Sequence, residues 1–284
     1  MTQSDLDLAY RVSRFRFWFY LTGPFTVGCI YGAQLYLDLL NIRFFVYLFY
    51  FLFPANVFLY GVNDYWDMET DQLNPKKDEK EHRIGAEERK RLARILQAVS
   101  VLSLLLLPLM QSNGERVILL VFLFLSHQYS AKPLRFKERP ILDSASNVLY
   151  IMPGVFAYYW VTGNLPPTVI LLAGFLHSYA LHLFSAIPDI EYDKETGITT
   201  TAVLLGRNLS LIICLIAWLG LSIITILVGG ASPFRFLPLV YPLMVLNLLL
   251  RGLKVDSVYW YYPYINIGLG GLMFLLEAIK TPWS

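Results

Sequence analysis

Long apolar stretches alternate with short polar connections along most of this chain. Five stretches contain no charged residue and have roughly the 17–25 residues that one crossing of a bilayer requires. We expect a membrane helix in each of them. They are Phe17–Leu37, Phe44–Asn63, Ile95–Asn113, Leu209–Gly229 and Val258–Leu276.

Four further stretches complete the expected set. No Asp, Glu, Lys or Arg lies in the 45 residues between Asp143 and Asp189, and a turn sequence at residues 163–167 divides that run into two spans. Two shorter stretches are included because the connectivity then works best, namely Val117–Ala131 and Phe236–Leu250. The pattern therefore predicts an all-α polytopic membrane protein with about nine transmembrane helices.

Composition supports a membrane protein and excludes several other classes. The 284 residues are 56% hydrophobic and only 15% charged, whereas soluble domains carry about 25% charged residues. A cytosolic enzyme, a disordered chain and a secreted disulfide scaffold are all excluded. The two cysteines, Cys29 and Cys214, lie in apolar segments and are expected to be small buried hydrophobes. The first apolar run is too long for a signal peptide, so we expect a retained span.

The distribution of basic residues predicts the orientation. If the N-terminus and every second connection face the cytoplasm, 19 of the 23 Lys and Arg residues lie on that side and 4 on the other. Cytoplasmic connections are enriched in Lys and Arg. We therefore expect a protein of the cell (inner) membrane with a cytoplasmic N-terminus.

Acidic residues gather at the cytoplasmic ends of two expected spans. The chain reads NDYWDMETD from Asn63 to Asp71, which places Asp64, Asp67 and Asp71 on one helix face. A second group reads DIEYD, with Asp189 and Asp193 one helical turn apart and His182 on the same stripe.

Like charges on one face repel, and bound divalent cations would make the arrangement favourable. Oxygen ligands without histidine or cysteine suit Mg²⁺, which binds through carboxylates and substrate phosphates. Either group alone is equally consistent with a solvated helix end. Two copies of D-x-E-x-D, four spans apart, instead suggest an old duplication whose halves face each other across a central cavity.

A basic segment, YSAKPLRFKERP, follows the fourth span from Tyr129 to Pro140. Lys132, Arg135 and Lys137 are cations that a diphosphate would require beside the metal ions, with arginine providing bidentate contacts. Lys76 and Lys77 could add to them. Basic cytoplasmic loops also arise for topological reasons alone, but together with the acidic groups these residues favour a diphosphate site.

These motifs resemble the UbiA superfamily of intramembrane prenyltransferases. Its N-D-x-x-D-x-x-x-D signature is matched by Asn63, Asp64, Asp67 and Asp71, and its D-x-x-x-D signature by Asp189 and Asp193. The Y-S-x-x-P-x-R-x-K pattern of several members is matched from Tyr129 to Lys137. The resemblance implies one prenyltransferase domain over residues 1–284, with a central cavity.

The resemblance also implies a role for each of these residues. The five aspartates would hold Mg²⁺ ions and assist catalysis, and Asn63 would contact metal or phosphate. The diphosphate would be bound by Tyr129, Lys132, Arg135 and Lys137. Some members place a lysine where this chain has Pro133, so Lys132 departs from their pattern.

The acceptor is indicated by the residues around the motifs. Members that act on aromatic acids often continue into R-T-x-x-R-P, whereas this chain reads QLNPKKDEKEHR over residues 72–83. The motif strings look most like the lycopene elongase branch, which implies a C5 dimethylallyl donor and a carotenoid acceptor that enters from the bilayer. A quinone precursor, a tetrapyrrole or a phosphosugar remains an alternative acceptor.

Two histidines lie inside the sixth expected span. His177 and His182 are functional candidates because ionisable groups are costly within a membrane, although a histidine that only packs between helices is the more common case. A secondary transporter with acidic ion sites is an alternative from another class. It predicts polar groups at mid-membrane, whereas here the carboxylates lie at the ends of spans.

Overall fold

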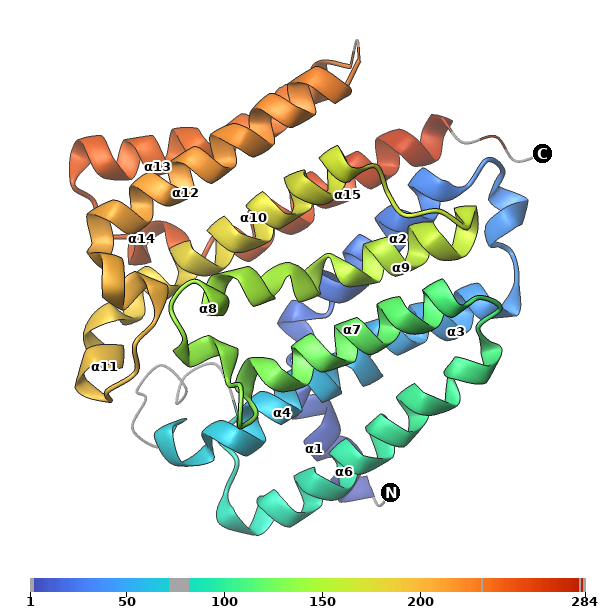
Figure 1. The fold of residues 1–284 in the computed structure, drawn as a ribbon, viewed down its shortest axis with the longest axis horizontal. Coiled ribbons are helices and arrows are strands. Elements are labelled where there is room, and N and C mark those ends of the chain that lie inside the picture. Colours follow the sequence, from blue (N-terminus) through green and yellow to red (C-terminus); the bar gives the residue numbers. More distant parts are fainter. Residues whose placement is uncertain (1–2, 72–81, 231, 281, 283–284) are drawn as a thin grey trace. The chain divides into compact units, whose positions relative to one another are not determined.

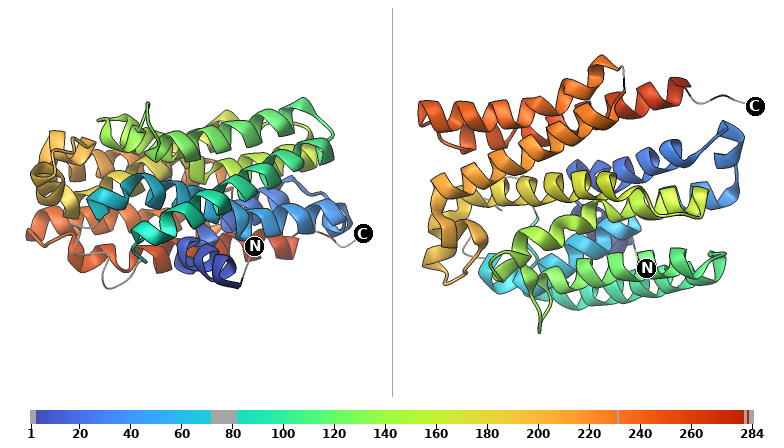
Figure 2. Two further views of the ribbon diagram at one scale, coloured as in Figure 1. Left: turned by 90° about the horizontal axis from the view of Figure 1, so that it is seen from below. Right: turned by 45° about the horizontal axis from the view of Figure 1, so that its top comes forward.

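All regular secondary structure in the described part of the chain is helical. The structure, a computed structural model, describes residues 3–71, 82–230, 232–280 and 282, and within them it has helices and loops but no strand (Figures 1 and 2). The expected all-α fold is confirmed. The chain divides into two compact units, the first of Met1–Arg135, Met152–Leu165 and Phe274–Ser284, the second of Phe136–Ile151 and Pro166–Met273.

The first unit contains the N-terminal helices. Its α-helices are α1 (Gln3–Val12), α2 (Phe19–Gly32), α3 (Ile42–Leu52), α4 (Pro54–Asp71), α6 (Ala86–Leu105), α7 (Asn113–Ser130) and α9 (Met152–Thr162). Its 3₁₀ helices are η1 (Phe15–Phe17), η2 (Tyr36–Leu39) and η3 (Leu107–Leu109).

The closest packing in the first unit joins α2 and α9, which lie side by side (Figure 1). A Cβ atom added to Gly28 would lie 2.2 Å from the carbonyl oxygen of Gly154, so glycine is required for this backbone approach. Small residues allow such approaches between membrane helices, where packing rather than the hydrophobic effect holds helices together. This contact connects α9 to the helix that follows η1.

The second unit contains the basic segment and the C-terminal helices. Its α-helices are α8 (Leu142–Ala145), α10 (Thr168–Ala186), α11 (Ile190–Glu195), α12 (Thr201–Val228), α13 (Val240–Arg251), α14 (Asp256–Tyr259) and most of α15 (Tyr262–Lys280). Its 3₁₀ helices are η4 (Phe136–Glu138), η5 (Ser146–Tyr150), η6 (Ile187–Asp189) and η7 (Pro233–Leu239).

An aromatic stack forms the core of the second unit, where α10 and α12 pack together. The ring of Trp218 stacks on Tyr241 with centroids 5.3 Å apart and on Tyr262 with centroids 5.5 Å apart. All three side chains are buried.

Both cysteines are free and buried, as the sequence predicts.

Six helical stretches in the described residues are long and apolar enough to cross a membrane. They are Ile42–Met68, Ala86–Leu109, Thr168–Glu195, Thr201–Val228, Pro233–Arg251 and Tyr262–Lys280. The other three expected spans correspond to α2, α7 and α9, of which α2 has 14 residues and α9 has 11. The η1 turn precedes α2, and α8 and η5 precede α9, so these segments are divided. The count of nine stays a prediction.

Candidate active site

Helix α4 carries the first acidic cluster, which we define as Asn63, Asp64, Asp67 and Asp71. The spacing places Asp64 and Asp67 almost one turn apart, and both are nearly inaccessible, at 3% and 2% exposure. Asp71 is the last residue of α4, and its side chain lies outside the described part of the structure. Two carboxylates buried this deeply require positive partners, because an isolated buried charge is very costly.

Arg14 supplies the partner of Asp64. Its Nη2 atom lies 2.6 Å from Asp64 Oδ1 and 3.4 Å from Asn63 Oδ1, and its guanidinium lies 4.9 Å from the centre of the Tyr60 ring. Arg14 has a left-handed backbone (φ 52°) in the short link between α1 and η1. Sequence reasoning missed this residue, since it treated the N-terminal arginines only as topogenic charges.

Arg135 is the partner of Asp67, whereas the sequence predicts Arg135 only as a diphosphate contact. Its Nη2 atom lies 3.1 Å from Asp67 Oδ1, while its Nη1 atom donates to the backbone oxygen of Ser130. Asn63 donates to Asp67 Oδ2 at 2.7 Å and to Ser130 Oγ at 3.0 Å. The structure thus brings Asn63, Asp67 and Arg135 together across α4 and α7.

The other basic-segment residues occupy varied positions. Tyr129 lies half-buried in the last turn of α7, and Lys132 is exposed in the loop that follows. Lys137 lies half-buried in η4, which belongs to the second unit. Lys76 and Lys77 lie outside the described residues.

The second acidic cluster, Asp189 and Asp193, lies on a less regular segment. The expected continuous stripe from His182 is interrupted, because α10 ends at Ala186 and the 3₁₀ turn η6 precedes α11. Both carboxylates are partly exposed. Thr200 Oγ1 donates to Asp193 Oδ2 at 3.4 Å, a long bond that connects α11 to the start of α12.

The donor atoms of the first cluster fit Mg²⁺. Carboxylate and amide oxygens on one helix end are the ligands this cation prefers, and Asp64, Asp67 and Asn63 present them together. Among the described residues no group of three or more His, Cys, Asp or Glu side chains is arranged to hold a metal. Instead Arg14 and Arg135 place guanidinium groups against Asp64 and Asp67.

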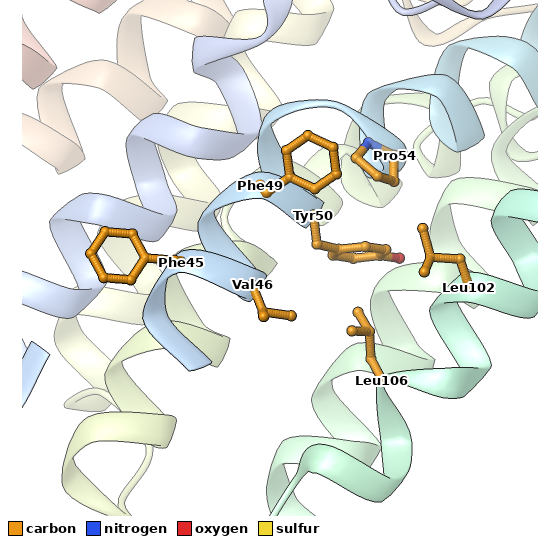
Figure 3. Close-up of a pocket in the computed structure, with 7 residues that line it drawn as sticks. All are labelled: Phe45, Val46, Phe49, Tyr50, Pro54, Leu102 and Leu106. Atoms are coloured by element: carbon orange, nitrogen blue, oxygen red, sulfur yellow. The ribbon is translucent and has the colours of Figure 1, made fainter. Parts of the chain in front are cut away.

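An apolar cavity in the first unit is distinct from this cluster. It measures about 290 Å³ and lies between α3, the start of α4 and α6 (Figure 3). Its lining is Phe45, Val46, Phe49, Tyr50, Pro54, Leu102 and Leu106. Pro54 and Asp64 are ten residues apart on α4, or about 15 Å along the axis. None of these lining residues carries a charge.

The two histidines of α10 have different surroundings. The Trp218 indole N–H donates to His177 Nδ1 at 3.3 Å, and the His177 ring lies 5.0 Å from the Tyr241 ring. His177 is thus part of the aromatic stack. His182 is partly exposed.

Comparisons with known proteins identify the family of this chain. The UbiA prenyltransferase family matches residues 21–257. A protein of Haloarcula japonica named lycopene elongase/hydratase is 41% identical over 274 residues, covering 96% of this chain and 92% of its own length. Its namesake from Halobacterium salinarum is also 41% identical, covering 94% and 95%.

The fold is shared with a solved structure. A UbiA homologue from Archaeoglobus fulgidus, in a structure bound to GPP and Mg²⁺, superposes with a TM-score of 0.72 over 95% of this chain and 99% of its own. The same homologue has also been solved with DMAPP and Mg²⁺. At 18% sequence identity this likeness concerns the fold alone.

Proposed function

This chain belongs to the UbiA prenyltransferase family, and we propose that it transfers a C5 dimethylallyl group from its diphosphate to a carotenoid such as lycopene. It is an integral membrane prenyltransferase. One observation carries the choice of acceptor, namely 41% identity over almost the whole chain to proteins named lycopene elongase/hydratase. Membership of an enzyme family leaves the transporter alternative without support.

We assign the acidic residues to Mg²⁺ and the basic ones to the diphosphate. Asp64, Asp67, Asp71, Asp189 and Asp193 would hold the ions, and Mg²⁺ would supply positive charge that stabilises the departing diphosphate. The oxygen donors of the first cluster support this assignment. Asn63, Tyr129, Lys132, Arg135 and Lys137 would bind the diphosphate.

The arginine pairs of the first cluster have a specific part in this proposal. Arg14 and Arg135 neutralise Asp64 and Asp67 while no cation is bound, which limits the cost of two buried negative charges. When a cation binds these carboxylates, both guanidinium groups become free to contact phosphate oxygens. Preorganised positive groups at a site of developing negative charge are the largest catalytic term in many enzymes.

The surrounding helices would exclude water from the reaction. An allylic cation reacts with water, so the acceptor carbon must meet it in a dry environment. The aromatic and aliphatic helices of a membrane protein provide one, and a hydrocarbon acceptor enters it from the bilayer. We further propose that residues 1–284 act as one catalytic domain in the inner membrane, with the N-terminus and the site in the cytoplasmic half.

The test is a product assay on membranes that contain this protein. Incubation with Mg²⁺, dimethylallyl diphosphate and lycopene is expected to give a mass gain of one or two C5 units. EDTA or Asp67→Asn should abolish the gain, whereas Glu191→Gln should not. Glu191 is a matched control, because it lies between Asp189 and Asp193 but is exposed and paired with Lys194.

Two results would contradict different parts of this proposal. Prenylation of a quinone precursor, a tetrapyrrole or a phosphosugar, with none of lycopene, would overturn the carotenoid acceptor and keep the enzyme class. Turnover of lycopene that persists in EDTA would overturn the role of Mg²⁺.

A further inference from the structure

Asp143, on helix α8 of the second unit, is a buried carboxylate outside both acidic clusters. It has 0% exposure. Its Oδ2 atom accepts a hydrogen bond from the backbone N–H of Thr201 at 2.8 Å, and its Oδ1 atom accepts one from the Thr201 hydroxyl. That hydroxyl oxygen also accepts from the backbone N–H of Ile141 at 2.6 Å. Two groups at the start of α8 therefore bind the first residue of α12.

The backbone at Ile141 is strained where it makes this contact. Its φ of 73° lies in a region that a β-branched residue adopts only as an outlier. Strain of this kind persists where the surrounding structure imposes it, and it is frequent near functional sites. The hydrogen bond to Thr201 is one of the contacts that hold Ile141 in this conformation, so the start of α8 is fixed against α12.

The first turn of α12 needs a contact outside its own helix. Gly206 has a non-helical backbone (φ 69°, ψ 171°), so residues 201–205 are separated from the long remainder of α12. The N–H groups of a first helical turn also have no partner within the helix. Asp143 accepts from one of them, and Thr200 Oγ1 accepts from another, that of Val203, at 3.3 Å. Asp143 therefore determines where this turn begins.

The same turn contacts Asp193, a proposed Mg²⁺ ligand. Thr200 Oγ1 donates to Asp193 Oδ2 at 3.4 Å. Because the Thr200 oxygen accepts from the N–H of Val203, its own proton is available for the aspartate. Thr200 is buried and adjacent to Thr201, so the contact between Thr201 and α8 also fixes the hydroxyl that reaches Asp193.

The link from Asp193 to Thr200 is a defined turn. Gly197 has a φ of 74°, and its N–H donates to the carbonyl oxygen of Lys194 at 3.2 Å. The next N–H, of Ile198, donates to the carbonyl oxygen of Asp193 at 2.8 Å. These two bonds form a Schellman motif, which ends a helix at a left-handed glycine. The backbone and the side chain of Asp193 are thus both held by the residues between α11 and α12.

Asp143 is also connected to the basic segment. Its backbone N–H donates to the carbonyl oxygen of Arg139 at 2.9 Å, and the Arg139 N–H donates to that of Phe136 at 3.0 Å. Phe136 begins η4, which contains Lys137 and packs against α8. Asp143 therefore lies between a proposed diphosphate contact and a proposed metal ligand, within one unit.

We infer that Asp143 is a positioning residue for Asp193 and acts through Thr201 and Thr200. This inference rests on the proposed function, in which Asp193 holds Mg²⁺. Hydrogen-bonding groups behind a metal ligand orient it, and their loss costs about 10–100-fold in metal affinity or activity. Asp143 itself contacts neither metal nor substrate. It determines where the Asp193 carboxylate lies relative to η4 and to α12.

The experiment measures metal binding without turnover. Mn²⁺, which is bound by the same oxygen ligands as Mg²⁺, is titrated into the purified protein with inorganic diphosphate, and electron paramagnetic resonance reports the bound ion. We expect Asp143→Asn and Thr200→Val to weaken Mn²⁺ binding about tenfold, since each interrupts the hydrogen bonds that lead to Asp193. Asp193→Asn should weaken binding at least as much. Thr200→Ser keeps the hydroxyl and should restore the parent affinity.

Steady-state kinetics provide a second readout. A misplaced metal ligand should raise the Mg²⁺ concentration needed for half-maximal C5 transfer, and saturating Mg²⁺ should recover most of the rate. KM for lycopene should not change, because the acceptor does not contact these groups.

Ser112→Ala is the matched control for the helix cap that Thr200→Val also removes. Ser112 Oγ accepts from the N–H of Glu115 at 3.2 Å at the start of α7, a helix without a proposed metal ligand. We expect this variant to lower the thermal unfolding midpoint and to keep the parent Mn²⁺ affinity. If Asp143→Asn does not fold, as judged by that midpoint, Thr201→Val replaces it, because it removes the hydroxyl bound by Asp143 and keeps the backbone N–H.

The possible outcomes are distinguishable. Parent Mn²⁺ affinity in Asp143→Asn or in Thr200→Val, while Asp193→Asn binds weakly, would overturn the inference alone. Equal losses of affinity in Ser112→Ala and Thr200→Val would mean a general loss of stability and would overturn it too. Parent affinity in Asp193→Asn would instead overturn the assignment of Asp193 to Mg²⁺. A parent protein that binds Mn²⁺ but forms no C5-extended product would overturn the proposed function.

Discussion

The two acidic clusters share a motif spacing but differ in their surroundings. In the first unit, Asp64 and Asp67 lie on the 18-residue helix α4, are almost fully buried, and each contacts an arginine. In the second unit, Asp189 and Asp193 are partly exposed and lie across a 3₁₀ turn and the six-residue helix α11.

The negative charges of the two clusters are therefore stabilised in different ways. A buried carboxylate needs a counter-ion, because removing it from water costs several kcal/mol. A partly exposed one is stabilised by solvent. The ion pairs of the first cluster therefore contribute to the stability of the first unit. The partly exposed carboxylates of the second cluster contribute much less to the stability of the second unit. Variants in the first cluster should change stability and activity together, and those in the second should change activity alone.

The largest effect is expected for Asp67→Asn. The variant removes a proposed metal ligand and the charge that holds Arg135, and loss of one preorganised electrostatic group costs about 10²–10³-fold in rate. We expect at least that loss in C5 transfer, together with a lower unfolding midpoint. Steady-state kinetics and thermal unfolding in detergent measure the two effects. A normal rate would remove Asp67 from the site.

Arg14→Ala should have the next largest effect, on stability. It leaves Asp64 buried without its partner, which costs on the order of 3–5 kcal/mol. Arg11→Ala is the control, because Arg11 pairs with Asp7 on an exposed surface, where such pairs contribute less than about 1 kcal/mol. If the unfolding midpoints of Arg14→Ala and Arg11→Ala coincide, the Arg14–Asp64 pair is unimportant for stability.

Asp193→Asn tests the other side of the comparison. We expect about 10²-fold slower transfer from the loss of one charged ligand and an unfolding midpoint equal to that of the parent. A marked drop in the unfolding midpoint would mean that the second cluster contributes to stability as much as the first. That result would contradict the difference proposed between the two clusters.

Helix packing is expected to differ between the units as well. Gly28→Ala would force a Cβ atom to within 2.2 Å of a backbone oxygen of α9, and overpacking of this kind costs about 1–3 kcal/mol. At Gly220 on α12 the nearest atom is the flexible Leu176 Cδ1 at 3.1 Å. Thermal unfolding should show a clear loss for Gly28→Ala and little change for Gly220→Ala. Equal losses would contradict this view of the α2–α9 contact.

The smallest effect is expected for Lys132→Ala. Lys132 is exposed, and exposed charge contacts contribute about 0.2–1 kcal/mol, so we expect less than a tenfold rise in KM for the donor. Arg135→Ala, which removes a guanidinium bonded to Asp67, should have a larger effect in the same assay. The reverse order would show that Lys132 is the principal diphosphate contact.

Much of the first cluster could be predicted because its residues are close in sequence. Helical spacing alone places Asn63, Asp64 and Asp67 close together in the C-terminal half of α4. The short helices α2 and α9 show the limit of that reasoning. Hydropathy counts apolar residues, but turns such as η1 and η5 divide apolar runs in ways that depend on local backbone geometry.

The sequence by itself determined the all-helical membrane fold, the family and the acidic motifs, because these depend on local composition and on spacings of a few residues. Only the tertiary structure decided which groups contact the buried carboxylates. Arg14 and Asp64 are 50 residues apart in the chain, and Asp143 and the Thr201 backbone N–H that it accepts from are 58 residues apart. Such contacts arise from how separate helices pack around buried charge, and no periodic pattern along the chain encodes them.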